Sequence, residues 1–115
     1  MVNAQTDRGQ CSLTVLAFCA PWCAHCQYQR KAFDLACAAL SPEVGRRWVD
    51  IEAEPGAVEA YGVEAIPMIL ALREGIECLR LVGVQSKEMI VEGVRASEAR
   101  GVTCGGRKSC RTAGR

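Results

Sequence analysis

Two cysteines separated by two residues are the part of this sequence best suited to chemistry. Cys23 and Cys26 directly follow an apolar run and directly precede a helix-like segment. Backbone N–H groups at the start of a helix lack hydrogen-bond partners and carry partial positive charge, which favours a thiolate over a thiol. Because a thiolate is a nucleophile, we expect Cys23, at the exposed tip, to attack and Cys26 to close a disulfide with it.

Two neighbours of the cysteines are candidates for tuning that thiolate. His25 is the only histidine of the chain and lies between the two cysteines. When protonated, it would place a positive charge close to the Cys23 sulfur, stabilise the reduced thiolate and raise the reduction potential of the pair. Trp22 is expected to shield the pair and pack beside it, although ordinary core packing explains this residue nearly as well.

The remaining six cysteines fall into three groups. Three lie in apolar segments and are expected to be plain buried thiols: Cys19, Cys37 and Cys78. Cys104 and Cys110 lie among glycines and basic residues, where they could form a disulfide, pass electrons to the active pair or stay passive exposed thiols. Cys11 has no assigned role.

Length and charge limit the functions that are possible. The chain has 115 residues, of which 50% are hydrophobic and 5% aromatic, so we expect one domain with an aliphatic core. Residues 1–94 carry a net charge of −4, whereas residues 95–115 carry +5. No aromatic residue is interleaved with the basic residues of this tail, which favours a solvated segment over a nucleic-acid-binding one.

The compartment is inferred from what the sequence contains. Eight cysteines would suit a small secreted protein, but their spacing is irregular. Residues 13–20 resemble a short signal-peptide core, yet a buried strand leading into the cysteine motif explains them as well. No segment approaches the roughly 20 apolar residues of a membrane span. We therefore expect a soluble, cytoplasmic protein without a membrane partner.

The elements that must position the cysteines follow from the hydrophobic pattern. It predicts strands at 13–18, 44–51, 68–72 and 76–82, the last two joined by a turn at Glu74-Gly75. It predicts helices at 23–40 and 57–61, and a last helix that Ser86 caps and that buries one apolar face, composed of Met89, Ile90 and Val94. This order indicates an α/β fold with a mixed sheet and helices on both faces.

The same pattern divides the chain into three parts. Residues 1–11 form a polar segment, residues 12–97 form the domain, and residues 98–115 form a basic, cysteine-containing tail that we expect to be flexible.

These motifs together resemble the thioredoxin family. The resemblance rests on Ala20 to Cys26 (APWCAHC) after a strand, on Val49-Asp50-Ile51, on Tyr61 to Pro67 (YGVEAIP), and on Gly83 before the last helix. It implies a thioredoxin fold with a sheet of about four strands, and a cis peptide bond between Ile66 and Pro67 that lies against the cysteine pair. In the family, the backbone before this proline pairs with substrate peptides.

The resemblance also implies an activity and partners. It implies a thiol–disulfide oxidoreductase that needs no cofactor or metal and acts on protein disulfides. Its electron donor would be a thioredoxin reductase-like enzyme or another dithiol protein. The charge of His25 favours an oxidising pair, whereas Ile66 before Pro67 is the choice of reducing thioredoxins, so the direction of electron flow stays open.

The sequence departs from the family in four respects. Ala24-His25 replaces the usual Gly-Pro between the cysteines, and Lys31 takes the place of a proline in the helix. Ala17 and Trp48 occupy the positions of a buried acid and its lysine partner, so we expect no proton acceptor for the second cysteine. We expect the family's first strand to be missing, which would leave residues 44–51 at a sheet edge.

Two other classes of function compete with the enzyme. Cys23, His25 and Cys26, with tail cysteines, could hold zinc, copper(I) or an iron–sulfur cluster, although the usual second local ligand pair is absent. A thioredoxin-like module could also bind partners through the Pro67 loop without catalysis. The retention of both active-site cysteines favours the oxidoreductase.

Overall fold

The computed structural model describes residues 13–99 of the chain. Its elements are β1 (Leu13–Cys19), α2 (Ala24–Ala39), β2 (Gly45–Asp50), α3 (Pro55–Tyr61), β3 (Met68–Arg73), β4 (Ile76–Val82) and α4 (Lys87–Ala99). Each predicted strand and helix is confirmed to within about three residues. The proposed boundaries at residues 12 and 97 stay predictions, because the polar segment and most of the tail lie outside the described residues.

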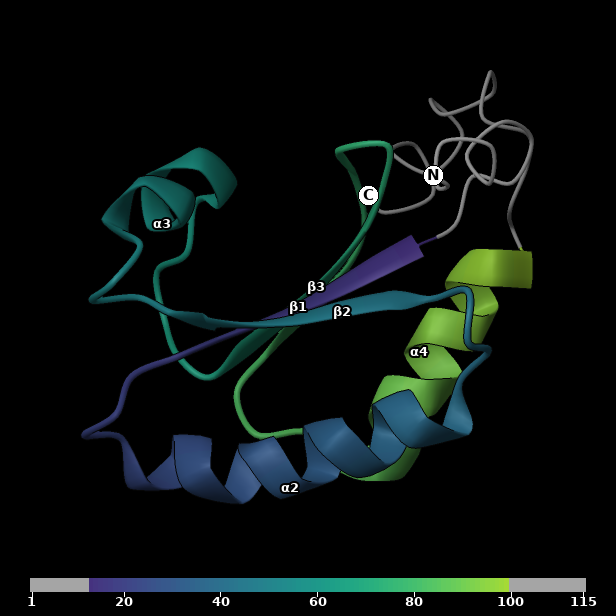
Figure 1. Cartoon of the computed structure of the whole chain (residues 1–115), viewed down its shortest axis with the longest axis horizontal. Helices are drawn as coiled ribbons and strands as arrows, with labels where there is room; N and C mark the ends of the chain where they lie inside the picture. Colours follow the sequence, from purple (N-terminus) through teal and green to yellow (C-terminus); the bar gives the residue numbers. More distant parts are fainter. Residues whose placement is uncertain (1–12, 100–115) are drawn as a thin grey trace.

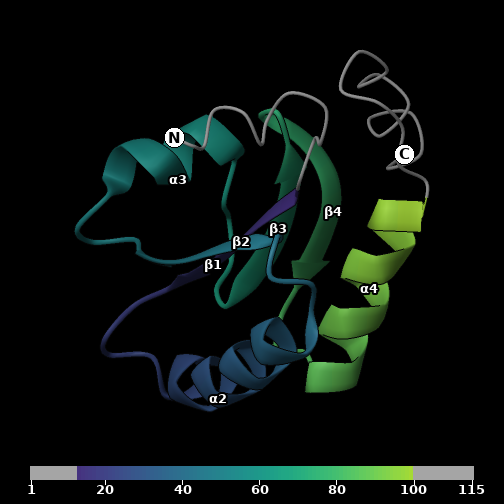
Figure 2. The same cartoon turned by 45° about the vertical axis from the view of Figure 1, so that its right-hand side comes forward.

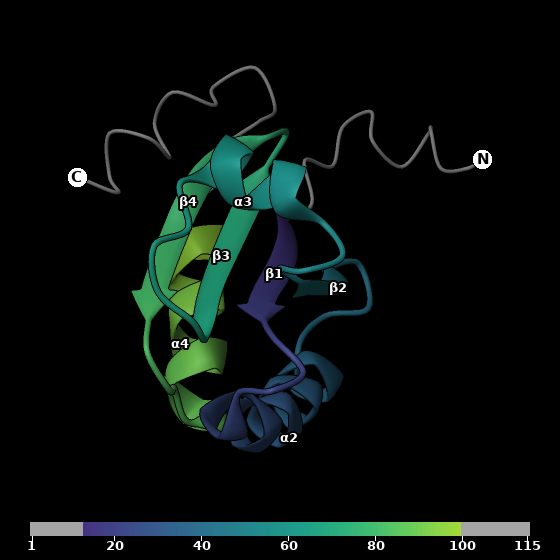
Figure 3. The same ribbon diagram turned by 90° about the vertical axis from the view of Figure 1, so that its left-hand side faces the viewer.

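The four strands form one mixed sheet in the order β2-β1-β3-β4 (Figure 3). β1 pairs with β2 in parallel and with β3 antiparallel, and β3 and β4 form a hairpin. Within the described residues β2 is therefore a sheet edge, as expected. The antiparallel register places Phe18 opposite Met68, so the C-terminal end of β1 lies beside the start of β3.

Helices cover both faces of the sheet (Figure 1). Strand alternation sends Leu13, Val15 and Ala17 toward α2 and α4, which pack together on one side (Figure 2). Leu16 and Phe18 point to the other side, where α3 contributes apolar side chains. β1 is apolar on both faces because both faces are buried.

The last helix agrees with expectation at its start and differs from it in two details. Ser86 caps it as predicted, since its Oγ accepts the backbone N–H of Met89 at 3.1 Å. Met89 itself is 53% exposed, and the buried residues are Ile90, Val94 and Ser97. The assignment of Met89 to the buried face was wrong, because Ile90, Val94 and Ser97 recur at helical spacing and form that face without it. The helix also extends to Ala99, whereas the apolar pattern of the sequence ends near residue 97.

Two of the cysteines expected to be buried thiols differ in the structure. Cys37 lies in α2 and is only half-buried, because it sits at the border of the helix face that packs on the sheet. Cys78 in β4 is buried but disulfide-bonded, whereas the other four cysteines among residues 13–99 are free thiols. Local periodicity reports burial and cannot report which sulfurs the fold brings together.

Candidate active site

Cys23 and Cys26 lie at the junction between β1 and α2. Cys23 is the N-cap residue, with extended backbone angles (φ −93°, ψ 113°), and its carbonyl oxygen accepts the N–H groups of Cys26 at 3.1 Å and Gln27 at 3.3 Å. Cys26 therefore occupies the first turn of the helix. Both cysteines are free thiols. This arrangement places the pair at the positive end of the helix dipole, as the sequence predicted.

The pair is more enclosed than the sequence suggested. Cys23 is 8% exposed and Cys26 is 2% exposed, so the expectation of an exposed tip at Cys23 is wrong. The backbone N–H of Cys23 donates to the carbonyl oxygen of Ala20 at 3.2 Å and folds the chain into a turn. Pro21 and Trp22 are the exposed residues of that turn, whereas Cys23 is buried.

Three cysteines, Cys19, Cys23 and Cys26, pack together in one small buried cluster. Burial is the main cause that raises the pKa of Cys26. Burial also raises the pKa of Cys19 well above the usual range, and its neighbour Cys26 adds to that rise.

Cys19 is thus part of the site, although the sequence analysis treated it as a plain buried thiol. It ends β1, is 1% exposed, and packs with Ala20, Cys23 and Cys26 in a small buried cluster. Its sequence position gave one usable signal. Cys19 is four residues before Cys23, and its side chain points to the same face of the sheet as Ala17 and therefore toward the active-site helix.

A pocket of about 390 Å³ lies beside Cys26. Its walls come from the end of β1, the first turns of α2 and the end of β2; they include Cys19, Cys26, Arg30, Trp48 and Asp50. Asp50 is paired with Cys19 in the sheet, and one of its carboxylate oxygens accepts the N–H of Glu52 at 2.9 Å. A carboxylate therefore lies on the same pocket as Cys26, which the sequence analysis did not anticipate.

The two substituted positions behind the cysteines are apolar. Ala17 is fully buried among aliphatic side chains of the core. Trp48 packs against the ring of Phe33, with centroids 5.7 Å apart, and the Arg30 guanidinium carbon lies 4.5 Å from its ring centroid. The tryptophan therefore forms an apolar wall of the site where the family has a lysine.

The Ile66–Pro67 peptide bond is cis, as the resemblance implied. Ile66 packs against the cysteine cluster, so this loop lies next to the two thiols. The carbonyl oxygen of Pro67 accepts the N–H of Gly83 at 2.9 Å, which ties the loop to the end of β4. The sheet register explains the proximity, because it sets the start of β3 beside the end of β1.

The two candidate tuning residues are both on the surface. His25 is exposed in the first turn of α2. Trp22 is 66% exposed, and its indole N–H donates to a carboxylate oxygen of Glu52 at 2.6 Å. Core packing therefore does not explain Trp22. The candidate accessory cysteines Cys104 and Cys110, and also Cys11, lie outside the described residues.

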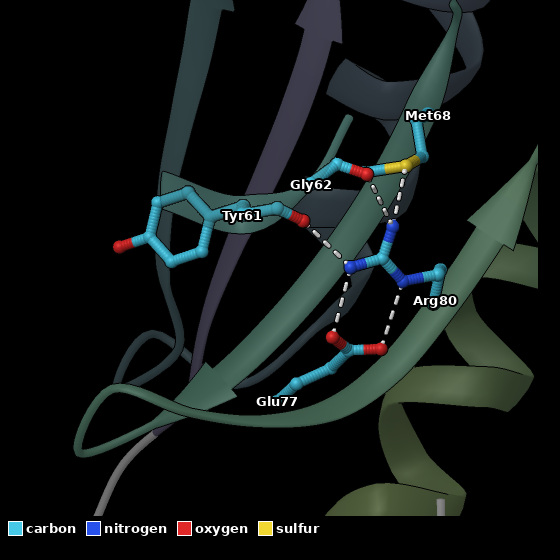
Figure 4. A network of polar contacts seen from close by, with 5 residues as sticks. All are labelled: Tyr61, Gly62, Met68, Glu77 and Arg80. Carbon is cyan, nitrogen blue, oxygen red and sulfur yellow. Dashed lines mark hydrogen bonds and ion pairs between the residues drawn. The ribbon is translucent and has the colours of Figure 1, made fainter. Parts of the chain in front are cut away.

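Arg80 of β4 holds the segment that leads to Pro67 (Figure 4). Its guanidinium donates to the carbonyl oxygens of Tyr61 at 2.7 Å and Gly62 at 3.3 Å, and its Nη1 approaches the Met68 sulfur at 3.4 Å. Glu77 receives two further hydrogen bonds from it, each 2.9 Å long. Local sequence gave no signal for this contact, because Arg80 and Tyr61 belong to different elements.

Among residues 13–99, no group of three or more histidine, cysteine or acidic side chains is placed to hold a metal ion. No helix in that part of the chain has the length and apolar character needed to span a membrane.

A four-stranded mixed sheet with helices on both faces, a Cys-x-x-Cys pair at a helix start and a cis-proline beside it define a thiol–disulfide oxidoreductase. Residues 5–96 match the family model Thioredoxin, and the chain belongs to the thioredoxin family. It is 32% identical over 80 residues to a thioredoxin of Chlamydia trachomatis, with 70% of this chain and 78% of that protein covered.

Two further comparisons agree with this assignment. The chain is 35% identical over 91 residues to protein disulfide isomerase-like 1-4 of Oryza sativa, which covers 76% of this chain but 16% of that longer protein. Among solved structures, Fasciola hepatica thioredoxin superposes with a TM-score of 0.66 at 28% identity, covering 76% of this chain and 83% of the other.

Proposed function

We propose that the protein reduces or exchanges protein disulfides through the Cys23/Cys26 couple. The observation that carries this proposal is the placement of two free thiols at a helix start, directly beside the cis-proline loop. The proposed substrates are disulfide-containing proteins. The proposed electron donor is a reductase of the thioredoxin reductase kind or another dithiol protein.

The reaction follows from the arrangement of the two sulfurs. The Cys23 thiolate attacks one sulfur of a substrate disulfide; a bond forms between Cys23 and that sulfur, and the other substrate sulfur leaves as a thiolate. Cys26 then loses its proton and attacks Cys23. The Cys23–Cys26 disulfide forms, the bond to the substrate breaks, and two electrons have passed from the protein to the substrate. The reverse sequence oxidises a dithiol.

The remaining site residues have proposed supporting roles. Ile66 and Pro67 would present backbone to an extended substrate segment, as the cis-proline loop does in the family. His25 would supply positive charge next to Cys23, and Trp22 would offer an exposed apolar surface to the substrate beside the thiols. None of these roles requires a cofactor.

The compartment stays a prediction. The four free thiols among residues 13–99 fit the reducing cytoplasm, whereas the Cys78 disulfide is a kind of bond that persists in oxidising compartments.

Insulin reduction in the presence of dithiothreitol tests the proposal. The wild-type protein should accelerate precipitation of the insulin B chain, and Cys23→Ser should abolish the acceleration because no nucleophile remains. A wild-type protein that performs no better than Cys23→Ser would instead favour a non-catalytic binding module. Stoichiometric metal in anaerobically purified protein, lost on Cys23→Ser, would favour the metal-binding alternative.

A further inference from the structure

Arg80 lies in β4 and faces α3. It is paired in the sheet with Leu70, whose side chain belongs to the buried cluster on the α3 side. Because residues that lie opposite each other on paired strands project from the same face of a sheet, the Arg80 side chain extends toward the end of α3. There its guanidinium donates to the carbonyl oxygens of Tyr61 at 2.7 Å and Gly62 at 3.3 Å. Both carbonyl groups lie at the C-terminal end of α3, where the helix itself supplies no donor, so Arg80 caps it.

The same guanidinium contacts both ends of the loop that contains the cis-proline. Gly62 directly precedes residues 63–67, and Met68 directly follows them. Nη1 of Arg80 lies 3.3 Å from the Gly62 carbonyl oxygen and 3.4 Å from the Met68 sulfur (Figure 4). Glu77 accepts two further hydrogen bonds, each 2.9 Å long, which fix the orientation of the guanidinium plane. One side chain therefore holds both ends of this loop.

Between these ends the loop has an exposed part and a packed part. Glu64 and Ala65 are exposed. Ile66 packs against the cysteine cluster, and Pro67 is buried. The Pro67 carbonyl oxygen also accepts the N–H of Gly83 at 2.9 Å. The backbone of Ile66 is therefore next to the thiols, and its position depends on how the ends of the loop are held.

We propose that Arg80 is a positioning residue for protein substrates. By holding both ends of residues 63–67, it keeps the backbone of Ile66 at the distance and orientation from Cys23 that an extended substrate segment requires for main-chain pairing. The proposal rests on the proposed oxidoreductase function and names the part of the substrate that Arg80 affects, which is the peptide backbone next to the disulfide. The reduction of a disulfide without a peptide backbone should therefore not depend on Arg80.

Two disulfides separate substrate recognition from the chemical step. Insulin offers peptide backbone on either side of its disulfides, whereas bis(2-hydroxyethyl) disulfide has none. Reduced protein is mixed with an excess of either disulfide at several concentrations, acid-quenched at intervals, alkylated and analysed by mass spectrometry for the Cys23–Cys26 disulfide. In each reaction that disulfide forms as one substrate disulfide is reduced to two thiols. The rates give a half-saturating concentration and a limiting rate for insulin, and a second-order rate constant for the small disulfide.

Three variants are compared with the wild type. Arg80→Ala removes the guanidinium, whereas Arg80→Lys retains the charge and can donate to the same carbonyl oxygens without the planar fork. Arg95→Ala is the matched control, because Arg95 also donates to a carbonyl oxygen at a helix C-terminus, that of Ala39 at 3.2 Å. Ala39 ends α2, whereas Cys23 lies at its start, so this contact is at the opposite end of α2 from the site.

Arg80→Ala should raise the half-saturating insulin concentration about three- to tenfold at an unchanged limiting rate, which is the effect of weakening one main-chain hydrogen bond to the substrate. Its rate constant for the small disulfide should stay within about twofold of the wild type, which also shows that the variant is folded. Arg80→Lys should recover part of the insulin loss, and it allows the same comparison if Arg80→Ala does not fold. Arg95→Ala should match the wild type with both disulfides.

Other results would overturn the proposal. An equal loss with both disulfides would show that Arg80 supports the fold or the cysteine pair in general. Equal losses in Arg80→Ala and Arg95→Ala would show an effect of stability alone. An unchanged half-saturating insulin concentration would exclude Arg80 from substrate recognition. A wild type that reacts with neither disulfide would instead refute the proposed function, and the role of Arg80 with it.

Discussion

The side chain of Gln29 forms two hydrogen bonds with the backbone of Gln85. Its Nε2 donates to the Gln85 carbonyl oxygen at 3.0 Å, and its Oε1 accepts the Gln85 N–H at 2.7 Å. Gln29 is fully buried and lies about one turn after Cys26, whereas Gln85 belongs to the loop between β4 and α4. The pair therefore joins the active-site helix to the segment in which Gly83 binds the cis-proline loop.

Replacing Gln29 with leucine should destabilise the protein by about 2–4 kcal/mol, because it leaves a buried N–H and a buried carbonyl oxygen unpaired. Urea unfolding measures the change in free energy. Gln27→Leu, at an exposed position of the same helix, is the matched control and should stay within about 0.5 kcal/mol of wild type. Equal effects of the two substitutions would show that the Gln29–Gln85 hydrogen bonds contribute little.

Arg80→Ala should cost about 1–2 kcal/mol, because it removes the hydrogen bonds to the Tyr61 and Gly62 carbonyl oxygens. Glu77→Gln leaves those two contacts in place and weakens a half-exposed ion pair, which is worth about 0–1 kcal/mol. Thermal unfolding of both variants separates the two contributions. If Glu77→Gln were as costly as Arg80→Ala, the ion pair rather than the backbone contacts would dominate.

Gly83→Ala should destabilise the protein by about 1–2 kcal/mol, because Gly83 has φ +92° and a side chain is strained there even though the space around it is open. Gly56 provides a contrast, since it also faces open space but lies in helix α3 without a positive φ. Gly56→Ala should be neutral or stabilise by up to about 1 kcal/mol. Chemical unfolding should therefore show destabilisation for Gly83→Ala alone, and a similar destabilisation of both variants would contradict the backbone argument.

We expect the free energy of unfolding to fall as the pH rises above about 8.5, the ordinary pKa of a cysteine thiol. This applies to the protein with its Cys23/Cys26 pair reduced. Burial raises the pKa values of Cys19, Cys26 and Cys37 in the folded chain. The unfolded chain then loses these protons first, so alkaline pH favours unfolding, and the stabilising effect is complete only below the unfolded pKa. Urea unfolding at neutral pH and near pH 10 measures the fall. Cys37→Ala should reduce the fall, and a flat profile would contradict the raised pKa values.

Replacing His25 should lower the reduction potential of the Cys23/Cys26 couple by roughly 30 mV or more, equivalent to about 1.4 kcal/mol, because a protonated imidazole there would stabilise the reduced thiolate. Equilibration in glutathione buffers measures this potential for His25→Pro and His25→Gln. Both variants remove the imidazole, but only proline changes the backbone. A shift in the proline variant alone would attribute the effect to backbone geometry, and an upward shift in both would refute the charge argument.

Much of the site could be predicted because its key residues are neighbours in sequence. Cys23 and Cys26 are three residues apart at a strand-to-helix junction, and the proline of the cis bond belongs to a local motif. Hydrophobic periodicity and flanking turn residues also located every strand and helix of residues 13–99, since most of these elements bury one or both of their faces. Local spacing is sufficient for such features.

The errors have a common origin. The sequence analysis placed Cys23 at an exposed tip, Met89 in the core and Cys78 among the free thiols. Each of these depends on tertiary contacts. The Ala20–Cys23 turn encloses the first, the face of α4 that packs on the sheet leaves the second exposed, and a second sulfur pairs with the third. Pattern alone does not contain that information.

By itself, then, the sequence determined the order of elements, the cysteine pair and the loop that accompanies it, because these depend on short-range spacing and burial. Only the tertiary structure decided that Cys19 packs with Cys26 in one buried cluster and that Asp50 lines the adjoining pocket. It also decided that Gln29 and Arg80 fix the two segments around Pro67. These contacts join strands, helices and loops that meet only when the sheet has formed, so their energetics exist only in the folded chain.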